Sequence, residues 1–418
     1  MLLTSSLFHN LKREKTLNYS FTSYSITLYL YLSDWLTSIP TLRSMRIAIV
    51  TEAFLPQVNG VTNSVLRLLE YCKQEGHDVL IIAPESQGAP NQYLGYKIKH
   101  VPSISMKKLI PMGVPKKYLE PLLEGFAPDV IHLASPIFLG HYVARIARKS
   151  GIPTVSVYQT DIAGFARHYG LTIAHNTLKR WISRIHQATD ITLAPSKWAC
   201  RDLEQSGVTN VRLWKRGVDT VNFNPLSRDA ELRNSLTDGT SKLIVGYVGR
   251  LANEKRIDDL KVLDQQDGIQ LVIVGDGPAG ARLRKELPNA KFVGYQSGKN
   301  LAKHVASFDI FVHTGKHETF CQGIQEALAS GVPVIGPDTG GPVDLIEHGV
   351  TGLLIDTANA HELVVAVETL RSHNSFDLMQ LAARRSVEHR TWDYINSQLM
   401  AHYRDAIEQL SKKREMVA

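Results

Sequence analysis

The chain has 418 residues, of which 44% are hydrophobic and 21% charged, and its formal net charge is +7. Because this length exceeds what one hydrophobic core usually organises, we expect two domains. The cysteines Cys72, Cys200 and Cys321 lie far apart and form no Cys-x-x-Cys pair, which indicates neither a disulfide framework nor a zinc site. The mild basic excess suits an anionic small molecule or an anionic membrane surface. There is no long basic run, and we expect no nucleic-acid partner.

Residues 1–44 differ from the rest of the chain because they are rich in Ser, Thr, Tyr and Leu without clear periodicity. Their most apolar stretch, 25–36, is interrupted by Ser33 and Asp34 and is too short to span a bilayer. We interpret residues 1–44 as an upstream extension outside the folded core, which results from a start codon assigned too early. A targeting peptide and a membrane-associating arm are the alternatives. We expect no transmembrane helix and a cytoplasmic location.

From Met45 onward, short apolar runs alternate with segments of helical periodicity, which is typical of βαβ units and a parallel sheet. Between the first two runs, Val61, Val65 and Leu68 recur at helical spacing, and Gly76 ends the helix. The strands of this first region are expected at 47–50, 79–82, 130–133, 154–157 and 191–193. One doubly wound domain is therefore predicted over residues 45–216.

The same pattern restarts in a second region, 217–390. Its strands are expected at 243–248, 271–274, 292–293, 310–312, 332–335 and 353–355. The stretch 217–241, with Asp219, Pro225 and Asp229, is interpreted as the linker. The sequence thus predicts an α/β fold with two tandem Rossmann-like parallel-sheet domains. Since ligands of such sheets bind at the carboxyl ends of the strands, we expect the site in an interdomain cleft.

The chain ends in two predicted helical segments, 360–372 and 391–410. The second has an apolar face formed by Trp392, Tyr394, Ile395, Leu399 and Tyr403. We predict that residues 391–418 cross back to the first domain. They would then tie the two domains together across a hinge, so that ligand binding by the second domain closes the cleft.

A G-x-G-x-x-G sequence occupies Gly275 to Gly280, directly after a predicted strand. A dinucleotide site would need an acidic residue about twenty positions further on, where this chain has Val293-Gly294-Tyr295-Gln296. The motif also lies in the middle of its domain. We therefore interpret the glycines as a tight strand-to-helix turn and not as an NAD site.

Charged residues follow two strands of the second domain. Arg250 and Lys255 lie in the loop after 243–248, where a guanidinium and an ammonium can converge on a diphosphate. In the segment 317–331, Glu318 lies in a loop and Glu326 lies about one turn into the predicted helix that follows. The backbone N–H groups at the start of this helix can bind phosphate. A carboxylate can also accept hydrogen bonds from vicinal ribose hydroxyls. Taken separately, these residues would more often be a solvated basic loop and surface or capping glutamates.

Together, the Gly-Arg-Leu-x-x-Glu-Lys loop, the Glu-x7-Glu element with Ala-Leu-Ala-Ser-Gly-Val-Pro-Val, and Gly217-Val218-Asp219 resemble the retaining family 4 glycosyltransferases of GT-B fold. The resemblance runs from about Met45 to at least Asp356. It implies that Arg250 and Lys255 hold the donor diphosphate, Glu318 the sugar and Glu326 the ribose. It further implies that the backbone at Phe320, Cys321 and Gln322 meets the phosphates and sugar, and that 292–296 borders the base.

A narrower resemblance rests on the segments 52–64, Tyr158-Gln159-Thr160-Asp161 and 317–322. They are similar to bacterial GDP-mannose-dependent α-mannosyltransferases that act on glycolipids, and more distantly to sulfolipid synthases. Gly60 suits close approach of the backbone to a phosphate or sugar. Many family members have a histidine where this chain has Gln159, whose amide cannot accept a proton at neutral pH. Gln159 and Asp161 are therefore expected to orient sugar hydroxyls, with Asp161 as a base the alternative.

The donor is expected to be GDP-mannose, and a UDP-sugar is the alternative because residue spacing does not distinguish the two bases. An alternative of another class is a non-catalytic protein that binds sugar nucleotides. The chain contains no Asp-x-Asp sequence, the usual metal-diphosphate handle of the other large glycosyltransferase fold. We therefore expect neither a metal nor any other cofactor, with the nucleotide sugar as donor substrate.

A last prediction concerns residues 103–123, where hydrophobic residues interleave with lysines. The hydrophobic residues are Ile104, Met106, Leu109, Ile110, Met112, Val114, Leu119 and Leu122, and the lysines are Lys107, Lys108, Lys116 and Lys117, with Lys97 and Lys99 nearby. Prolines exclude one continuous amphipathic helix, so insertion would use a loop and short turns. We predict peripheral binding to the anionic inner face of the cell membrane, where a glycolipid acceptor lies. An ordinary loop with solvated lysines is the alternative.

Overall fold

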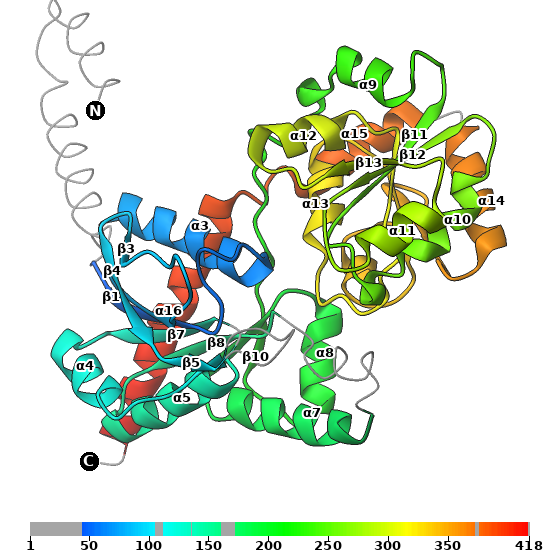
Figure 1. Ribbon diagram of the computed structural model, residues 1–418. Helices are drawn as coiled ribbons and strands as arrows, with labels where there is room; N and C mark the ends of the chain where they lie inside the picture. Colours follow the sequence, from blue (N-terminus) through cyan, green and yellow to red (C-terminus); the bar gives the residue numbers. More distant parts are fainter. Residues whose placement is uncertain (1–43, 105–111, 135, 160–171, 373–375, 417–418) are drawn as a thin grey trace, which may run out of the picture. The chain divides into compact units, whose positions relative to one another are not determined.

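The structure, a computed structural model, describes residues 44–104, 112–134, 136–159, 172–372 and 376–416 (Figure 1). Apart from Ser44, the predicted extension 1–44 lies outside the described residues. Within the described part of the chain, no helix combines the length and the apolarity needed to cross a membrane.

The first domain is built on an eight-stranded sheet with the strand order β10-β9-β8-β7-β1-β2-β4-β3. Neighbouring strands are parallel except β3 and β4, which are antiparallel. The strands are β1 (Arg46–Thr51), β2 (Asp78–Pro84), β3 (Gln92–Tyr93), β4 (Tyr96–Val101), β7 (Val130–Ala134), β8 (Thr154–Val157), β9 (Ile191–Ala194) and β10 (Val211–Leu213). The helices are α3 (Gly60–Gln74), α4 (Leu119–Phe126), α5 (Phe138–Ser150), α7 (Thr172–Gln187) and α8 (Lys197–Gln205), and β5 (Ser103–Ile104) pairs with β6 (Met112–Gly113).

Both faces of this sheet are covered, which explains its uninterrupted apolar strands. In β1, Ile47 and Ile49 belong to one hydrophobic cluster, and Ala48 and Val50 belong to another on the opposite face. Parallel strands covered on both faces read as continuous hydrophobic runs. The predicted parallel sheet of the first domain is thus confirmed.

Strand β4 was not predicted, because its sequence alternates. Its residues Tyr96-Lys97-Ile98-Lys99 are buried and exposed in turn. Period-two alternation is the signature of a strand with one solvated face, and a search for apolar runs overlooks it. Because β4 lies near the sheet edge, one of its faces meets water.

The second domain holds a six-stranded parallel sheet with the order β13-β12-β11-β14-β15-β16. The strands are β11 (Leu243–Val248), β12 (Ile269–Val274), β13 (Lys291–Gly294), β14 (Ile310–Val312), β15 (Val334–Pro337) and β16 (Gly352–Ile355). The helices are α9 (Ala230–Leu236), α10 (Lys261–Asp264), α11 (Gly280–Glu286), α12 (Gly298–Ala306), α13 (Gln322–Ala329), α14 (Ala360–Arg371) and α15 (Phe376–Val387). The 3-10 turns are η1 (Pro225–Ser227), η2 (Asn253–Lys255), η3 (Ile257–Leu260) and η4 (Gly341–Asp344). The two tandem Rossmann-like sheets confirm the predicted fold class.

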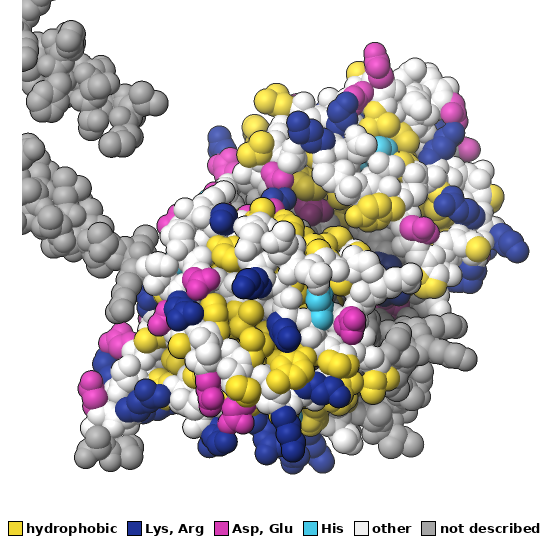
Figure 2. Space-filling view, turned by 60° about the vertical axis from the view of Figure 1, so that its left-hand side comes forward, with side chains coloured by type: hydrophobic (Ala, Val, Ile, Leu, Met, Phe, Trp, Pro, Cys, Tyr) yellow, Lys and Arg dark blue, Asp and Glu magenta, His cyan; other side chains and the backbone are white. Residues whose placement is uncertain are grey.

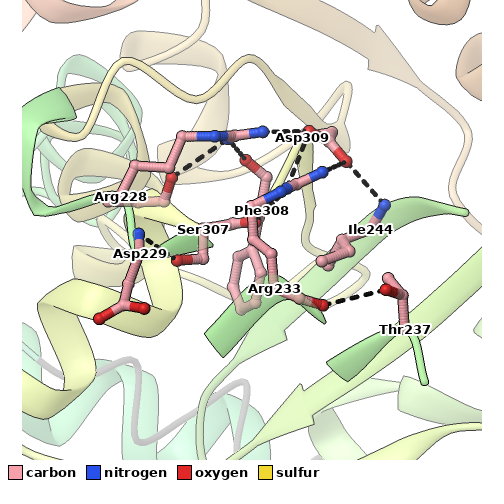
Figure 3. A network of polar contacts seen from close by, with 9 residues as sticks. Arg228, Asp229, Arg233, Thr237, Ile244, Ser307, Phe308 and Asp309 are labelled. Carbon is pink, nitrogen blue, oxygen red and sulfur yellow. Dashed lines mark hydrogen bonds and ion pairs between the residues drawn. The ribbon is translucent and has the colours of Figure 1, made fainter. Parts of the chain in front are cut away.

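The stretch 217–241, interpreted as a linker, is more ordered than expected. It contains η1 and helix α9, which is anchored to the start of β14 by one carboxylate (Figure 3). Asp309 accepts hydrogen bonds from Arg228 (2.7 Å) and Arg233 (3.0 Å), and also from the backbone N–H of Ile244 (2.8 Å). Much of the predicted linker therefore packs as part of the second domain.

The last helix, α16 (Trp392–Glu415), packs on the first sheet, where it contacts α3, β7 and β8 (Figure 1). Its Ile395, Leu399 and Tyr403 belong to the hydrophobic cluster of the first domain. The Tyr403 hydroxyl lies 2.9 Å from His132 Nδ1, and Trp214 Nε1 donates to the Ile395 carbonyl oxygen at 2.9 Å. The final helix thus completes a core formed by the other end of the folded chain.

Candidate active site

The loop after β11 carries two of the predicted donor-binding residues. Arg250 is exposed, whereas Lys255 is partly buried at the end of η2. The glycine-rich turn after β12 packs against the backbone of this loop. A Cβ at Gly275 would collide with the carbonyl oxygen of Gly249, and a Cβ at Gly277 would collide with the carbonyl oxygen of Leu251. The glycines therefore permit close backbone approach, in agreement with the interpretation as a tight turn.

Lys255 is paired with Glu318, the first glutamate of the Glu-x7-Glu element. Its Nζ donates to Glu318 Oε1, and the same oxygen lies 3.3 Å from His313 Nε2. Burial alone would raise the pKa of Glu318, but the charges of Lys255 and His313 outweigh it and lower this pKa to about 2. Burial would conversely lower the pKa of His313, but Cys321 and Glu318 raise it to about 9. At neutral pH Glu318 is therefore ionised, and it lies between Lys255 and His313.

The start of helix α13 brings together the other residues expected at the phosphates. Cys321 is the N-cap residue with φ 82°, a left-handed conformation that is costly for a residue with a side chain, and it makes no side-chain cap hydrogen bond. Phe320 before it is buried, and Gln322 begins the helix. The first N–H groups of α13 therefore have no side-chain cap among the described residues, which suits an anionic ligand.

Glu326 lies one turn into α13 and is partly buried. Burial raises its pKa to about 8, although Arg216 and a hydrogen bond with Gln322 act in the opposite direction. The two glutamates of the element thus differ at neutral pH, since Glu318 is ionised and Glu326 is largely protonated.

Arg216 was not singled out from the sequence, yet it joins three of the predicted site residues. This side chain is only 6% exposed. It donates to the Gln159 amide oxygen (2.7 Å), to the Gly60 carbonyl oxygen (2.6 Å) and to the Gln322 amide oxygen (3.3 Å). The only sequence signal was its position directly before the Gly217-Val218-Asp219 motif, which was quoted without it.

Gly60 and Gln159 therefore lie together, as residues of the first domain in contact with one guanidinium. Gly60 begins helix α3, and a Cβ built there would meet nothing within 4 Å, so no packing contact requires a glycine. Gln159 follows β8, and its carbonyl oxygen accepts a 2.9 Å hydrogen bond from Thr319 of the second domain. Asp161 lies outside the described residues. Among the described residues, no group of three or more His, Cys, Asp or Glu side chains is arranged to hold a metal ion.

Two tandem Rossmann-like domains, with charged residues gathered at the carboxyl ends of the second sheet, define the chain as a nucleotide-sugar-dependent glycosyltransferase of the GT-B class. Residues 58–222 match Glycosyltransferase Family 4, and residues 228–384 match Glycosyl transferases group 1. The chain belongs to glycosyltransferase family 4.

Similar curated proteins include the GDP-mannose-dependent alpha-mannosyltransferases of Corynebacterium glutamicum and Mycolicibacterium smegmatis. The first is 45% identical over 88% of this chain and 90% of its own length, and the second is 47% identical over 86% and 97%. Among solved structures, sucrose-phosphate synthase from Thermosynechococcus elongatus has a TM-score of 0.72 at 18% identity, with 87% of this chain and all of that chain covered. At that identity the likeness shows the fold alone.

Proposed function

We propose that this chain transfers mannose from GDP-mannose to a glycolipid acceptor with retention of anomeric configuration. The observation that carries the proposal is the 45–47% identity, over nearly the whole folded chain, to proteins named as GDP-mannose-dependent alpha-mannosyltransferases. The contacts of Lys255, Glu318 and Arg216 support it, because residues that the family resemblance assigns to the donor are in contact here.

In this proposal the second domain holds the donor. Arg250, which is exposed, and Lys255, which is partly buried, neutralise the diphosphate. The N–H groups of Phe320, Cys321 and Gln322, at the uncapped start of α13, donate to its oxygens. Glu318 accepts hydrogen bonds from the mannose hydroxyls, and Glu326 binds the ribose. The leaving phosphate takes the acceptor proton on the same face of the sugar, so that no protein base is required. Gln159 and Asp161 orient hydroxyl groups.

We also propose the division of the chain that the sequence indicated. Residues 45–216 bind the acceptor, 217–390 bind the nucleotide sugar, and 391–418 cross back to the first domain. The packing of α16 on α3, β7 and β8 supports the last part.

The acceptor is proposed to lie in an anionic membrane, which the protein approaches through residues 103–123. Ile104 is 58% exposed, and Lys116 and Lys117 of the same segment are also exposed, whereas Lys107 and Lys108 lie outside the described residues. Leu119, expected at the surface, is instead fully buried in the core of the first domain, and Leu122 packs against that core. Insertion is therefore confined to the part of the segment before α4. Figure 2 shows Lys and Arg side chains dispersed among hydrophobic ones on one face.

Donor specificity is tested by following nucleotide release from GDP-mannose and from several UDP-sugars with the same enzyme preparation. We expect release from GDP-mannose. Release from UDP-sugars alone would overturn the mannose assignment and favour a UDP-sugar-dependent transferase. No release from any donor, with tight binding of GDP-mannose, would instead indicate a non-catalytic binding protein.

Membrane binding is tested by co-sedimentation with vesicles. The protein should pellet with anionic but not with neutral vesicles, and salt should release it. The variant Lys116→Glu/Lys117→Glu should pellet less, whereas Lys285→Glu/Lys299→Glu, the same charge change at exposed lysines of the second domain, should pellet like the wild type. Binding that did not depend on lipid charge and was unchanged in both variants would overturn the proposal and show that residues 103–123 form an ordinary loop with solvated lysines.

A further inference from the structure

Arg216 is a buried cation whose three hydrogen-bond acceptors are uncharged. Its guanidinium donates to two side-chain amides and one backbone carbonyl, and it forms no ion pair within 4 Å with any described residue. Burial lowers its pKa to about 10, and Glu326 partly offsets this. Since a buried charge is costly without compensation, this arrangement needs a reason beyond packing.

The reason follows from the polarity of a guanidinium, which donates hydrogen bonds and accepts none. Gln159 must therefore turn its amide oxygen toward Arg216, as the 2.7 Å contact shows. This choice points Gln159 Nε2, with its two N–H donors, away from Arg216. Nε2 is buried and has no hydrogen-bond partner among the described residues. A buried donor without a partner costs free energy unless a ligand oxygen accepts from it.

The same guanidinium orients an amide of the second domain. Arg216 Nε donates to Gln322 Oε1, and Gln322 Nε2 in turn donates to the Gly217 carbonyl oxygen at 3.0 Å. The backbone of Gln159 is held independently by Thr319, whose carbonyl oxygen accepts from Ser196 at 2.7 Å. The Gln159 backbone is thus fixed without Arg216, and what Arg216 adds is the direction of the side-chain amide.

We propose that Arg216 is a positioning residue that holds the Gln159 amide with its nitrogen free, so that Gln159 donates a hydrogen bond to an oxygen of the bound nucleotide sugar. The proposal rests on the proposed function and adds to it how residue 159 is oriented. It also explains how glutamine can stand where many relatives have histidine, because a neutral imidazole beside Arg216 would likewise accept at one nitrogen and donate at the other.

The test is a double-mutant cycle on nucleotide release from GDP-mannose, with Arg216→Met, Gln159→Met and both together. We expect each single variant to lower kcat/KM about 10- to 100-fold, the range of a hydrogen bond to a charged or buried group. The double variant should have a kcat/KM no lower than that of the worse single variant, because both single substitutions abolish the same hydrogen bond from Gln159 to the nucleotide sugar. Arg216→Lys, which keeps the charge without the planar fork, should restore little. Arg212→Met, an arginine of the same segment paired with Asp405, should match the wild type.

A second readout does not depend on the fold tolerating Arg216→Met, because it uses Arg216→Gln. In Gln159→His, Arg216 should keep the imidazole neutral, and kcat/KM should be flat from pH 6 to 8. Combining Gln159→His with Arg216→Gln, which removes the positive charge and keeps a polar side chain, should introduce an inflection near the ordinary histidine pKa of about 6.5.

Additive losses in the cycle, with weaker binding of GDP by Arg216→Met, would show that Arg216 contacts the donor itself and would overturn the proposal. A flat pH profile of kcat/KM in the variant that combines Gln159→His with a substitution of Arg216 would also overturn the proposal. If the wild type released no nucleotide from GDP-mannose, the proposed function would fail instead, whatever the variants did.

Discussion

Lys255 and Arg216 are both cations inside the candidate site, but their partners differ in charge. Lys255 pairs with the carboxylate of Glu318, whereas Arg216 donates to amides and a backbone carbonyl. A diphosphate that binds Lys255 competes with a protein anion already in place. A ligand that approaches Arg216 meets no such competitor, because no carboxylate of the described residues lies within 4 Å of its guanidinium. The surroundings of Lys255 are thus suited to exchange one anion for another. The surroundings of Arg216 are suited to hold neutral groups in fixed directions.

The largest loss of activity is expected when the carboxylate of Glu318 is removed. Glu318→Ala should lower kcat about 100- to 1000-fold, the usual cost of removing one group that stabilises the reacting sugar. Arg250→Ala should chiefly raise KM for GDP-mannose. Nucleotide release measures both, with Glu368→Ala in helix α14 as the control glutamate. If Glu318→Ala left turnover unchanged while Arg250→Ala abolished it, the role proposed for Glu318 would have to be withdrawn.

The free energy of unfolding tests whether Lys255 and Glu318 stabilise each other. Lys255→Met and Glu318→Gln each leave a partly buried charge without its main partner and should each lower the free energy of unfolding by about 1–3 kcal/mol. The double variant should lose less than the sum of the two. Urea denaturation followed by circular dichroism gives all four values. Strictly additive losses would show that the pair is not coupled.

The pH dependence of stability tests the surroundings of Arg216 through Glu326, whose folded pKa of about 8 lies above its ordinary value of 4.5. Between these values the folded protein retains a proton that the unfolded chain releases, so stability falls as pH rises through this window. Glu326→Gln lacks this titration. Its melting temperature relative to the wild type should therefore increase from pH 5 to pH 8 and then level off. A difference independent of pH would contradict the raised pKa.

The smallest expected effect concerns the contacts between the domains. Arg216, through Gln322, and Thr319, through Gln159, connect the predicted acceptor and donor halves, and α16 extends from the second domain to the first. We expect GDP-mannose to reduce the radius of gyration slightly in small-angle scattering. Arg216→Lys should reduce the change, and Arg212→Lys should not. Equal curves with and without donor would rule out closure.

The sequence predicted those parts of the fold and site that depend on local pattern. The apolar run 243–248 coincides with β11, since a parallel strand covered on both faces is hydrophobic throughout. Strand β4 was missed because only one of its faces is buried. Lys255 and Glu318 were singled out by motif, and they are in contact. Arg216 was missed because its role depends on Gly60, Gln159 and Gln322, which are distant in sequence and adjacent only after folding.

The packing of α16 on the first sheet also has a consequence for the order in which the protein folds during synthesis. Ile395, Leu399 and Tyr403 complete a core that otherwise consists of residues translated far earlier, including Ile47 and Leu68. Until the last residues leave the ribosome, that hydrophobic surface stays uncovered, whereas the second sheet already has all its strands. The half of the protein that is made first would therefore be the half that finishes folding last.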